Sequence, residues 1–225
     1  MENKNILIVR ECIEQITNLK HFDRVYDYYS PSCVFHTPPY VGLGIMHDES
    51  SGQQVAIKMV AANAPATGKV QVGDIVLRAS DGSRVWEGFE SLRAGMWGLG
   101  VSGTTLKLIL LRDGETIEVT IVRGRVEGFD STMAESLDVW LFYMTHEVPD
   151  LHTEINYILA DGDRVAYFAT NTGTNAIYHQ SAVWTECNIL RLENGKIVEW
   201  WGVEDLFSMR QQFGYQMVEP AKAQP

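Results

Sequence analysis

The chain has 225 residues, of which 45% are hydrophobic and 21% are charged, so it can bury a substantial core and long disorder is excluded. Its 18 Lys and Arg against 29 Asp and Glu give a net charge of -11, which argues against nucleic acid or an anionic membrane as a partner. The length predicts two compact domains or one interrupted domain.

Cysteine usage and the N-terminal segment both indicate a reducing compartment. Cys12, Cys33 and Cys187 are odd in number and far apart, which favours buried thiols over a disulfide framework or a zinc site. The N-terminal stretch has charges on both sides of a short apolar run, unlike a signal peptide or a membrane span. We therefore expect a cytoplasmic protein without a metal or other cofactor.

Helical spacing dominates the first forty residues. Apolar residues recur every three or four positions from Lys4 to Leu19, which predicts an amphipathic helix. A second, short helix over residues 22–29 is expected to end at Ser30 and Pro31. The next stretch, CVFHTPP, predicts a brief extended segment.

Strand patterns replace the helical ones from Val41 onward. Two short β-branched runs, QQVAIKMV and DIVLRAS, predict strands, and two alternating runs joined by an Asp-Gly turn predict a hairpin. One helix is expected from Trp86 to Trp97. Residues 40–127 hold 9 basic and 10 acidic side chains, so the acidic excess lies in the rest of the chain.

The C-terminal part returns to a helix followed by strands. An apolar stripe runs along the predicted helix after Gly128, and strands are then expected in LHTEINYILADG, DRVAYFATNTG and QSAVWTECNILRLENGKIVEWWGVED. The last of these breaks at Asn194-Gly195 into a hairpin. A final helix is expected over 205–213. The two flanks together predict an α+β fold with helices on one face of an antiparallel sheet.

A glycine turn, GLGI, opens the middle segment. It lacks the pattern of a phosphate-binding loop. Together with VQVGDIV and ASDG at their spacings, it resembles the PDZ domain of bacterial protease-associated proteins over residues 40–126. The resemblance implies a partly open β-barrel that binds a protein C-terminus through backbone N–H groups, with the peptide-binding residues Gly42, Leu43, Gly44, Ile45 and Leu92. The alternative is a lid, spacer or dimer contact that binds no peptide.

The flanks, residues 1–39 and 127–215, carry a series of short motifs: PDLH, GDRVA, GT, GKIVE-x-W and an Asp followed by Q-x-G. As a series they resemble the SnoaL-like polyketide cyclase family of the nuclear transport factor two-like superfold. The resemblance implies a cone-shaped, curved antiparallel sheet with packed helices, interrupted by the inserted PDZ-like domain. It also implies a homodimer formed through the outer face of the sheet, and residues 216–225 are expected to be a flexible tail.

By the same resemblance, Asp205 acts as acid and base in an intramolecular aldol closure. Alternation along the strand places Glu199, Trp201 and Asp205 on one face. A carboxylate beside indole rings in an apolar pocket loses hydration, so its pKa is expected to rise toward neutrality. Because Asp205 also precedes a predicted helix, a role as the helix N-cap is the alternative.

His36 is the second catalytic candidate, because the resemblance places a polar pocket residue at this position; a purely structural histidine is the alternative. The family's G-T-H motif reads G-T-N here, which replaces an imidazole by Asn175, a residue expected to hydrogen-bond a ligand oxygen. The remaining predicted substrate-binding residues are Trp201, Trp184 and Tyr29.

Glu186 shares its strand parity with Trp184 and Asn188. If this set faced inward, Glu186 would be a buried carboxylate and a functional candidate. Because Val183 on the other parity competes with Trp184 for the core, periodicity does not choose, and we expect Glu186 to face solvent.

Two functions follow from these patterns. The first is cofactor-free acid/base chemistry, either aldol cyclisation or isomerisation, on a small apolar carbonyl compound, with the PDZ-like domain binding a C-terminal peptide or gating the pocket. The second is a non-catalytic protein that binds a small ligand and recruits partners through the PDZ-like groove.

Overall fold

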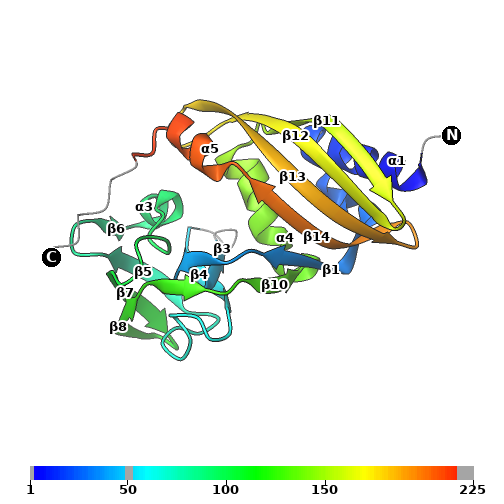
Figure 1. Cartoon of the computed structure of the whole chain (residues 1–225). Coiled ribbons are helices and arrows are strands. Elements are labelled where there is room, and N and C mark those ends of the chain that lie inside the picture. The colour runs from blue at the N-terminus through cyan, green and yellow to red at the C-terminus, as the bar shows by residue number, and fades with distance from the viewer. Residues whose placement is uncertain (1–2, 49–52, 217–225) are drawn as a thin grey trace, which may run out of the picture. The chain divides into compact units, whose positions relative to one another are not determined.

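The computed structural model describes residues 3–48 and 53–216 (Figure 1). The chain divides into two compact units. Unit 1 comprises residues 1–37 and 130–225, and unit 2 comprises residues 38–129. The domain borders expected from the sequence lie two and three residues from these.

Five α-helices and three short helices of other kinds lie in the described residues. Four of the α-helices belong to unit 1, and two of these, α1 and α4, continue as π-helices. The helices of unit 1 are α1 (Lys4–Cys12), η1 (Ile13–Asn18), η2 (Phe22–Arg24), α2 (Val25–Tyr28), α4 (Met133–Phe142), η3 (Tyr143–Glu147) and α5 (Leu206–Gln212). The α+β class expected from the sequence is confirmed.

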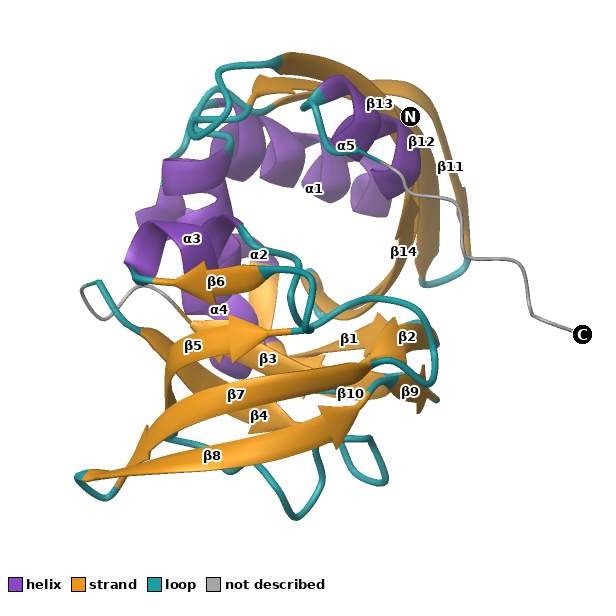
Figure 2. Ribbon diagram, turned by 90° about the vertical axis from the view of Figure 1, so that its left-hand side faces the viewer, coloured by secondary structure: helices purple, strands orange, loops and turns teal. Residues whose placement is uncertain are grey.

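The sheet of unit 1 has six strands in the order β10-β1-β14-β13-β12-β11. Their bounds are β1 (Tyr29–Thr37), β10 (Phe129–Thr132), β11 (His152–Asp161), β12 (Arg164–Thr174), β13 (Ser181–Glu193) and β14 (Lys196–Glu204). The sheet curves around helix α1 (Figure 2), and register shifts in the β11–β12 and β13–β14 pairs mark β-bulges, which bend strands.

One strand pair differs from the purely antiparallel sheet expected from the sequence. Strand β1 runs parallel to β14, with Phe35 opposite Trp200 and His36 opposite Trp201. Parallel neighbours need a long connection instead of a hairpin. The chain between β1 and β14 contains unit 2 and four strands of the unit 1 sheet, so this requirement is met.

Alternation along the strands separates an inner, covered face from an outer face. In β12, Val165, Tyr167 and Ala169 are buried in the core, whereas Phe168 between them is exposed. Val9 and Ile16, from α1 and η1, are fully buried in the same core. The helices therefore cover the inner face, and each strand presents alternate residues to it.

Unit 2 is built on a second sheet in the order β3-β4-β5-β7-β8, with β6 paired to β5 and a separate ribbon of β2 and β9. The bounds are β2 (Tyr40–Gly42), β3 (Ile45–Asp48), β4 (Val55–Val60), β5 (Ile75–Ser80), β6 (Val85–Glu87), α3 (Phe89–Ala94), β7 (Thr105–Arg112), β8 (Glu115–Val122) and β9 (Gly124–Val126). Strands β3 and β8 end the sheet, so it does not close into a barrel.

The helix expected from Trp86 to Trp97 is much shorter in the structure. Trp86 lies in β6, and α3 ends at Ala94. The backbone at Gly95 packs directly on the Trp86 ring, and a Cβ at this position would lie only 2.3 Å from a ring carbon. Trp97 is fully buried beyond the helix, and its indole Nε1 donates to the Leu92 carbonyl at 2.9 Å.

The cysteines differ in part from expectation. Cys12 and Cys33 are buried, whereas Cys187 is exposed on the outer face of β13. Burial raises the pKa of the Cys12 and Cys33 thiols to about 12. Within residues 3–48 and 53–216, no helix combines the length and apolar character needed to cross a membrane.

A buried ion pair links two parts of unit 2. The side chain of Asp74 is fully buried and accepts hydrogen bonds from Arg112 Nε at 2.7 Å and Nη2 at 2.6 Å. The backbone N–H of Gln71 donates to the same carboxylate at 2.9 Å. Burial acts to raise the pKa of Asp74, but these hydrogen bonds outweigh it, so the net shift is downward.

Asp74→Asn is expected to lower the unfolding free energy of unit 2 by about 3 kcal/mol at pH 7, because it leaves Arg112 without its charged partner. The folded-state pKa is depressed, so this stability is present above the ordinary Asp pKa and is lost as pH falls through the lower value. Urea titration followed by hydrogen exchange of β5 and β7 amides measures the effect. Asp113→Asn, in an exposed turn next to Arg112, is the control, and an equal loss there would contradict the assignment.

Candidate functional site

Two glutamates face each other on the inner side of the unit 1 sheet. Glu186 in β13 is directly opposite Glu204 in β14, and Glu186 is only 8% exposed. Directly opposed residues have Cβ atoms about 5 Å apart. At that spacing two negative charges repel strongly, so the pair is most stable when it holds one proton.

The pKa values of both carboxyls reflect this arrangement. Burial raises the pKa of Glu186, against the opposing effect of hydrogen bonds from its neighbours. Burial and then the charge of Glu186 raise the pKa of Glu204 to about 7. The two groups titrate as a pair, and the pair exchanges a proton near neutral pH.

Glu204 is both enclosed and reachable. Its residue surface is exposed, although burial of the carboxyl is the largest cause of its raised pKa. Glu204 is therefore the member of the pair that solvent reaches, whereas Glu186 is buried.

Polar side chains from β12 support Glu186. Tyr167 and Asn171 both hydrogen-bond its carboxyl. Thr153 in β11 donates from Oγ1 to Asn171 Oδ1 at 2.6 Å, which leaves the Asn171 amide nitrogen as the donor toward Glu186. The hydrogen bonds to Thr153 and Glu186 therefore fix the orientation of the Asn171 amide in the absence of a ligand.

Asn188, two residues along β13, is oriented in a similar way. Trp200 Nε1 donates to Asn188 Oδ1 at 2.5 Å. Gly202 makes room for this contact, since a Cβ there would lie 2.2 Å from the same oxygen. With its oxygen held by Trp200, Asn188 turns its amide nitrogen toward the Glu186 carboxyl, and this contact acts to lower the pKa of Glu186.

The basic residue of the site comes from the last helix. Arg210 in α5 has its pKa lowered by burial, with Glu204, Glu147 and Tyr143 among the groups that act against this. Burial also raises the pKa of Tyr143, which the charge of Glu204 raises further. The inner face thus combines a carboxyl pair, phenol hydroxyls and a half-buried guanidinium.

This arrangement is suited to moving protons. A pair that shares one proton contains an acid and a base at the same pH, so it can remove a proton from carbon and return one to oxygen. Within residues 3–48 and 53–216, no cluster of three or more His, Cys, Asp or Glu side chains has a geometry suited to a metal ion.

Asp205 does not lie in the apolar pocket that the sequence analysis predicted for it. Asp205 is exposed and its Oδ1 accepts a hydrogen bond from the backbone N–H of Ser208 at 3.0 Å, so it forms the N-cap of α5. Glu199 and Trp201 share one strand parity as expected, but Val203, which has the same parity, is 63% exposed. Their face is the outer one, because Glu204 and Gly202 are opposite the inward Glu186 and Asn188.

His36 lies on the same outer face, stacked on Trp201 with ring centroids 4.6 Å apart. Its Nδ1 is 2.8 Å from Asp130 Oδ1 and its Nε2 is 3.8 Å from Glu199 Oε1. The contacts place His36 and Trp201 in a network on the outer face, apart from the carboxyl pair.

The other predicted substrate-binding residues lie in three different surroundings. Trp184 is 2% exposed on the inner face, in edge-to-face contact with Phe213. Tyr29 is 6% exposed and packs edge-on against Trp140. Asn175 is buried in a loop, and its Oδ1 accepts backbone hydrogen bonds from Ile177 and Tyr178, both at 3.0 Å.

The expectation that Glu186 faces solvent is wrong. Trp184, Glu186 and Asn188 all face inward, whereas Val183 and Ile189 are 56% and 42% exposed. No signal in the sequence decides this, because both faces of the strand carry a large apolar residue and only the packed helices show which face is covered. Glu204 was missed because it precedes Asp205, which occupies the motif position.

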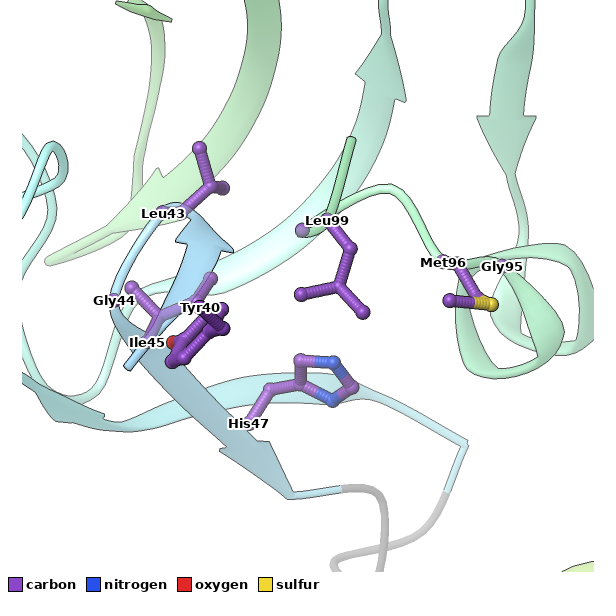
Figure 3. Close-up of a pocket in the computed structure, with 9 residues that line it drawn as sticks. Tyr40, Leu43, Gly44, Ile45, His47, Gly95, Met96 and Leu99 are labelled. Carbon is purple, nitrogen blue, oxygen red and sulfur yellow. The ribbon is translucent and has the colours of Figure 1, made fainter. Parts of the chain in front are cut away.

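Unit 2 has a cavity of about 190 Å³ beside strand β3 (Figure 3). The predicted peptide-binding residues Leu43, Gly44 and Ile45 line this cavity. Leu92, another predicted residue, does not line it and is 2% exposed in the core of unit 2. The His47 ring stacks on Trp97 with centroids 5.2 Å apart. The complete lining is Tyr40, Leu43, Gly44, Ile45, His47, Gly95, Met96, Gly98 and Leu99.

Comparison with known families bears on unit 1. Residues 131–213, which include both glutamates of the pair, match the SnoaL-like polyketide cyclase family. The match confirms the expected resemblance for this segment, which is less than half of the chain. No curated protein sequence is similar to the chain.

One solved structure shares the fold of this chain, and two others are similar to it in part. IdmH from Streptomyces antibioticus, a candidate polyketide cyclase, is 15% identical with a TM-score of 0.50, covering 95% of this chain and all of IdmH. A candidate polyketide cyclase from Bacillus cereus is 31% identical over 37% of this chain and 55% of its own, with a TM-score of 0.34. An epoxide hydrolase of the LEH-like kind from M. tuberculosis is 12% identical, covers 93% of this chain and 89% of its own, and has a TM-score of 0.43.

The carboxyl pair predicts a specific pH dependence of stability. The folded-state pKa of Glu204 is raised to about 7, so its contribution is fully present below the ordinary Glu pKa and is lost as pH rises through 7. Wild type should therefore lose unfolding free energy between pH 5 and 8, and Glu204→Gln should lose less. Urea unfolding at these pH values measures the difference. Glu154→Gln, exposed on β11, should keep the wild-type slope, and an unchanged slope in Glu204→Gln would refute the shared proton.

Proposed function

We propose that unit 1 catalyses cofactor-free acid/base chemistry on a small, neutral, mostly apolar carbonyl compound. The single observation that carries this is the enclosed pair Glu186 and Glu204, in which the pKa of Glu204 is raised to about 7. Aldol cyclisation and double-bond isomerisation both need proton removal next to a carbonyl and proton delivery to an oxygen. In this proposal the pair takes the role of proton carrier that the family resemblance implied for Asp205.

The proton balance of such a reaction is simple. The ionised carboxylate of the pair takes a proton from the carbon next to the carbonyl, while the protonated partner gives its proton to the carbonyl oxygen. The product of this step is an enol, and the pair still holds one proton. In an isomerisation the pair returns its proton to a different carbon and takes back the enol O–H proton as the carbonyl re-forms. In an aldol closure the enol carbon attacks a second carbonyl, the oxygen of that carbonyl takes the proton of the pair, and the enol O–H proton returns to the pair.

The charges around the pair favour a neutral substrate. Glu147 lies in the same environment as Glu204 and Arg210, so the acidic groups outnumber the one arginine among them. An anionic ligand would be repelled by this balance. The buried aromatic rings of Trp184 and Tyr167 supply apolar contact area, which suits a compound with few polar groups.

Family resemblance supports the same class of chemistry. The segment with both glutamates is SnoaL-like, and that family is described as polyketide cyclases. We propose that the whole of unit 1 belongs to this family, with unit 2 as an insertion that resembles a PDZ domain.

A proton-exchange assay tests the catalytic proposal. Deuterium incorporation next to the carbonyl of a panel of apolar cyclic ketones and β-keto esters is followed by NMR in D2O. Glu186→Gln and Glu204→Gln should each slow the enzymatic exchange at least about 100-fold, because each removes half of the acid/base pair. The rate should depend on pH around the raised pKa of Glu204.

Asp205→Asn is the matched control, since it changes an adjacent carboxylate that caps α5. Its exchange rate should stay within about threefold of wild type. If Asp205→Asn abolished exchange while Glu204→Gln kept it, the proton carrier would be Asp205. Absence of exchange by wild type on the entire panel would count against the enzyme.

We also propose that unit 2 binds an extended peptide along β3. The cavity of about 190 Å³ borders this strand, which ends its sheet, so the strand edge and an adjacent side-chain pocket lie together. Strand addition at a sheet edge uses backbone hydrogen bonds for affinity and pockets for specificity. A protein segment is therefore the proposed partner of this unit.

A homodimer through the outer face of the unit 1 sheet is the third element of the proposal. A continuous row crosses four strands in register: Tyr157, Phe168, Cys187 and Val203. Tyr157 is 72% exposed and Val203 63% exposed, so the row presents apolar surface outward. Large exposed apolar patches mark association surfaces.

Phe168→Lys should convert the dimer to a monomer, because it places a charge in the middle of this row. Size-exclusion chromatography with light scattering measures the mass. Leu7→Lys, which changes an exposed leucine on α1, should leave the dimer intact. A wild-type monomer at high micromolar concentration would contradict the dimer.

A further inference from the structure

The glycine turn of unit 2 already has hydrogen-bond partners for two of its backbone N–H groups. Leu43 N–H donates to the carbonyl oxygen of Gly98 at 3.1 Å. Gly44 N–H hydrogen-bonds the hydroxyl oxygen of Tyr40. These are two of the donors that would converge on a terminal carboxylate if the turn acted as an anion-binding nest.

We infer that the groove of unit 2 takes an internal extended segment of a partner protein and does not require a free C-terminal carboxylate. This inference rests on the proposed peptide binding along β3. The Gly98 carbonyl and the Tyr40 hydroxyl occupy the end of the groove in place of the two carboxylate oxygens. A chain that continues past the groove therefore loses nothing relative to one that ends there.

The segment that supplies the Gly98 carbonyl is firmly held. Trp97, next to it, is fully buried, and its carbonyl accepts a hydrogen bond from Arg123 Nη2 at 2.9 Å. Arg123 is itself 3% exposed and donates from Nη1 to Thr104 Oγ1 at 3.0 Å. Moving Gly98 out of the turn would disturb this buried guanidinium, so a carboxylate does not displace it easily.

The glycine at position 42 is also explained by the nearby Gly98 segment. It forms an isolated antiparallel bridge with Leu99, and a Cβ at Gly42 would lie 2.8 Å from the Gly98 oxygen. Glycine at this position thus permits the close approach of the Gly98 segment. The residue that the sequence pattern assigned to peptide binding serves the contact that closes the groove end.

Electrostatics point the same way. An incoming carboxylate would meet the Gly98 carbonyl oxygen, which carries partial negative charge, and would find two of its donors already engaged. The groove itself offers apolar contacts from Ile45, Met96 and Leu99, with His47 beside them (Figure 3). An uncharged extended segment with one apolar side chain in the cavity fits these contacts.

A peptide array tests the inference with the full chain as the probe. Each ten-residue sequence, with apolar residues varied at its last four positions, is presented as a free acid, as a C-terminal amide, and followed by a Gly-Ser extension. Binders are expected to bind in all three forms with affinities within about twofold. A preference of tenfold or more for the free acid would overturn the inference and leave peptide binding standing. Absence of any binder would overturn both.

Hydrogen exchange of the unliganded protein tests the contacts directly. The amides of Leu43 and Gly44 should exchange slowly in wild type, because both are hydrogen-bonded. Tyr40→Phe should speed exchange at Gly44 at least about tenfold and should create a preference for free-acid peptides. Tyr157→Phe, in unit 1, should change neither. Unprotected Leu43 and Gly44 amides in wild type would overturn the inference.

Discussion

The parallel pairing of β1 with β14 is the contact on which the architecture of unit 1 depends. It joins the chain before unit 2 to the strand that ends at Glu204. Because side chains alternate along a strand, a slip of one residue would turn Glu204 to the outer face and Trp201 to the inner one. The bulges and the antiparallel register with β13 hold β14 in the position that sets Glu204 opposite Glu186.

Placing two carboxylates opposite each other costs stability, and the surroundings show how the sheet tolerates it. Tyr167 and Asn171 donate toward Glu186, while Thr153 and Trp200 orient the amides next to it. These contacts belong to rigid strands instead of loops, which suits a site that must hold its geometry during proton transfer. Burial and repulsion between the two carboxylates raise the pKa of Glu204 to about 7, so the pair keeps one proton near neutral pH.

In unit 2, the same residues admit two interpretations until the structure is known. A glycine turn can hold an anion with its N–H groups, or it can permit the close approach of another backbone segment. Gly42 does the second, with Gly98 as its neighbour. The buried side chain of Trp97, which donates to the Leu92 carbonyl, fixes the chain after α3 so that Gly98 lies next to the glycine turn.

Much of the secondary structure was predictable because local spacing determines it, as in the alternating strand β12 and the hairpin turn at Asn194-Gly195. Sequence alone also indicated that Glu186 shares a face with Trp184, and that Asp205 could cap a helix. It did not determine which face is covered, because alternation is symmetric and only the packing of α1 and η1 breaks the symmetry. The pairing of Glu186 with Glu204 likewise follows from register between strands, which only the tertiary structure decides.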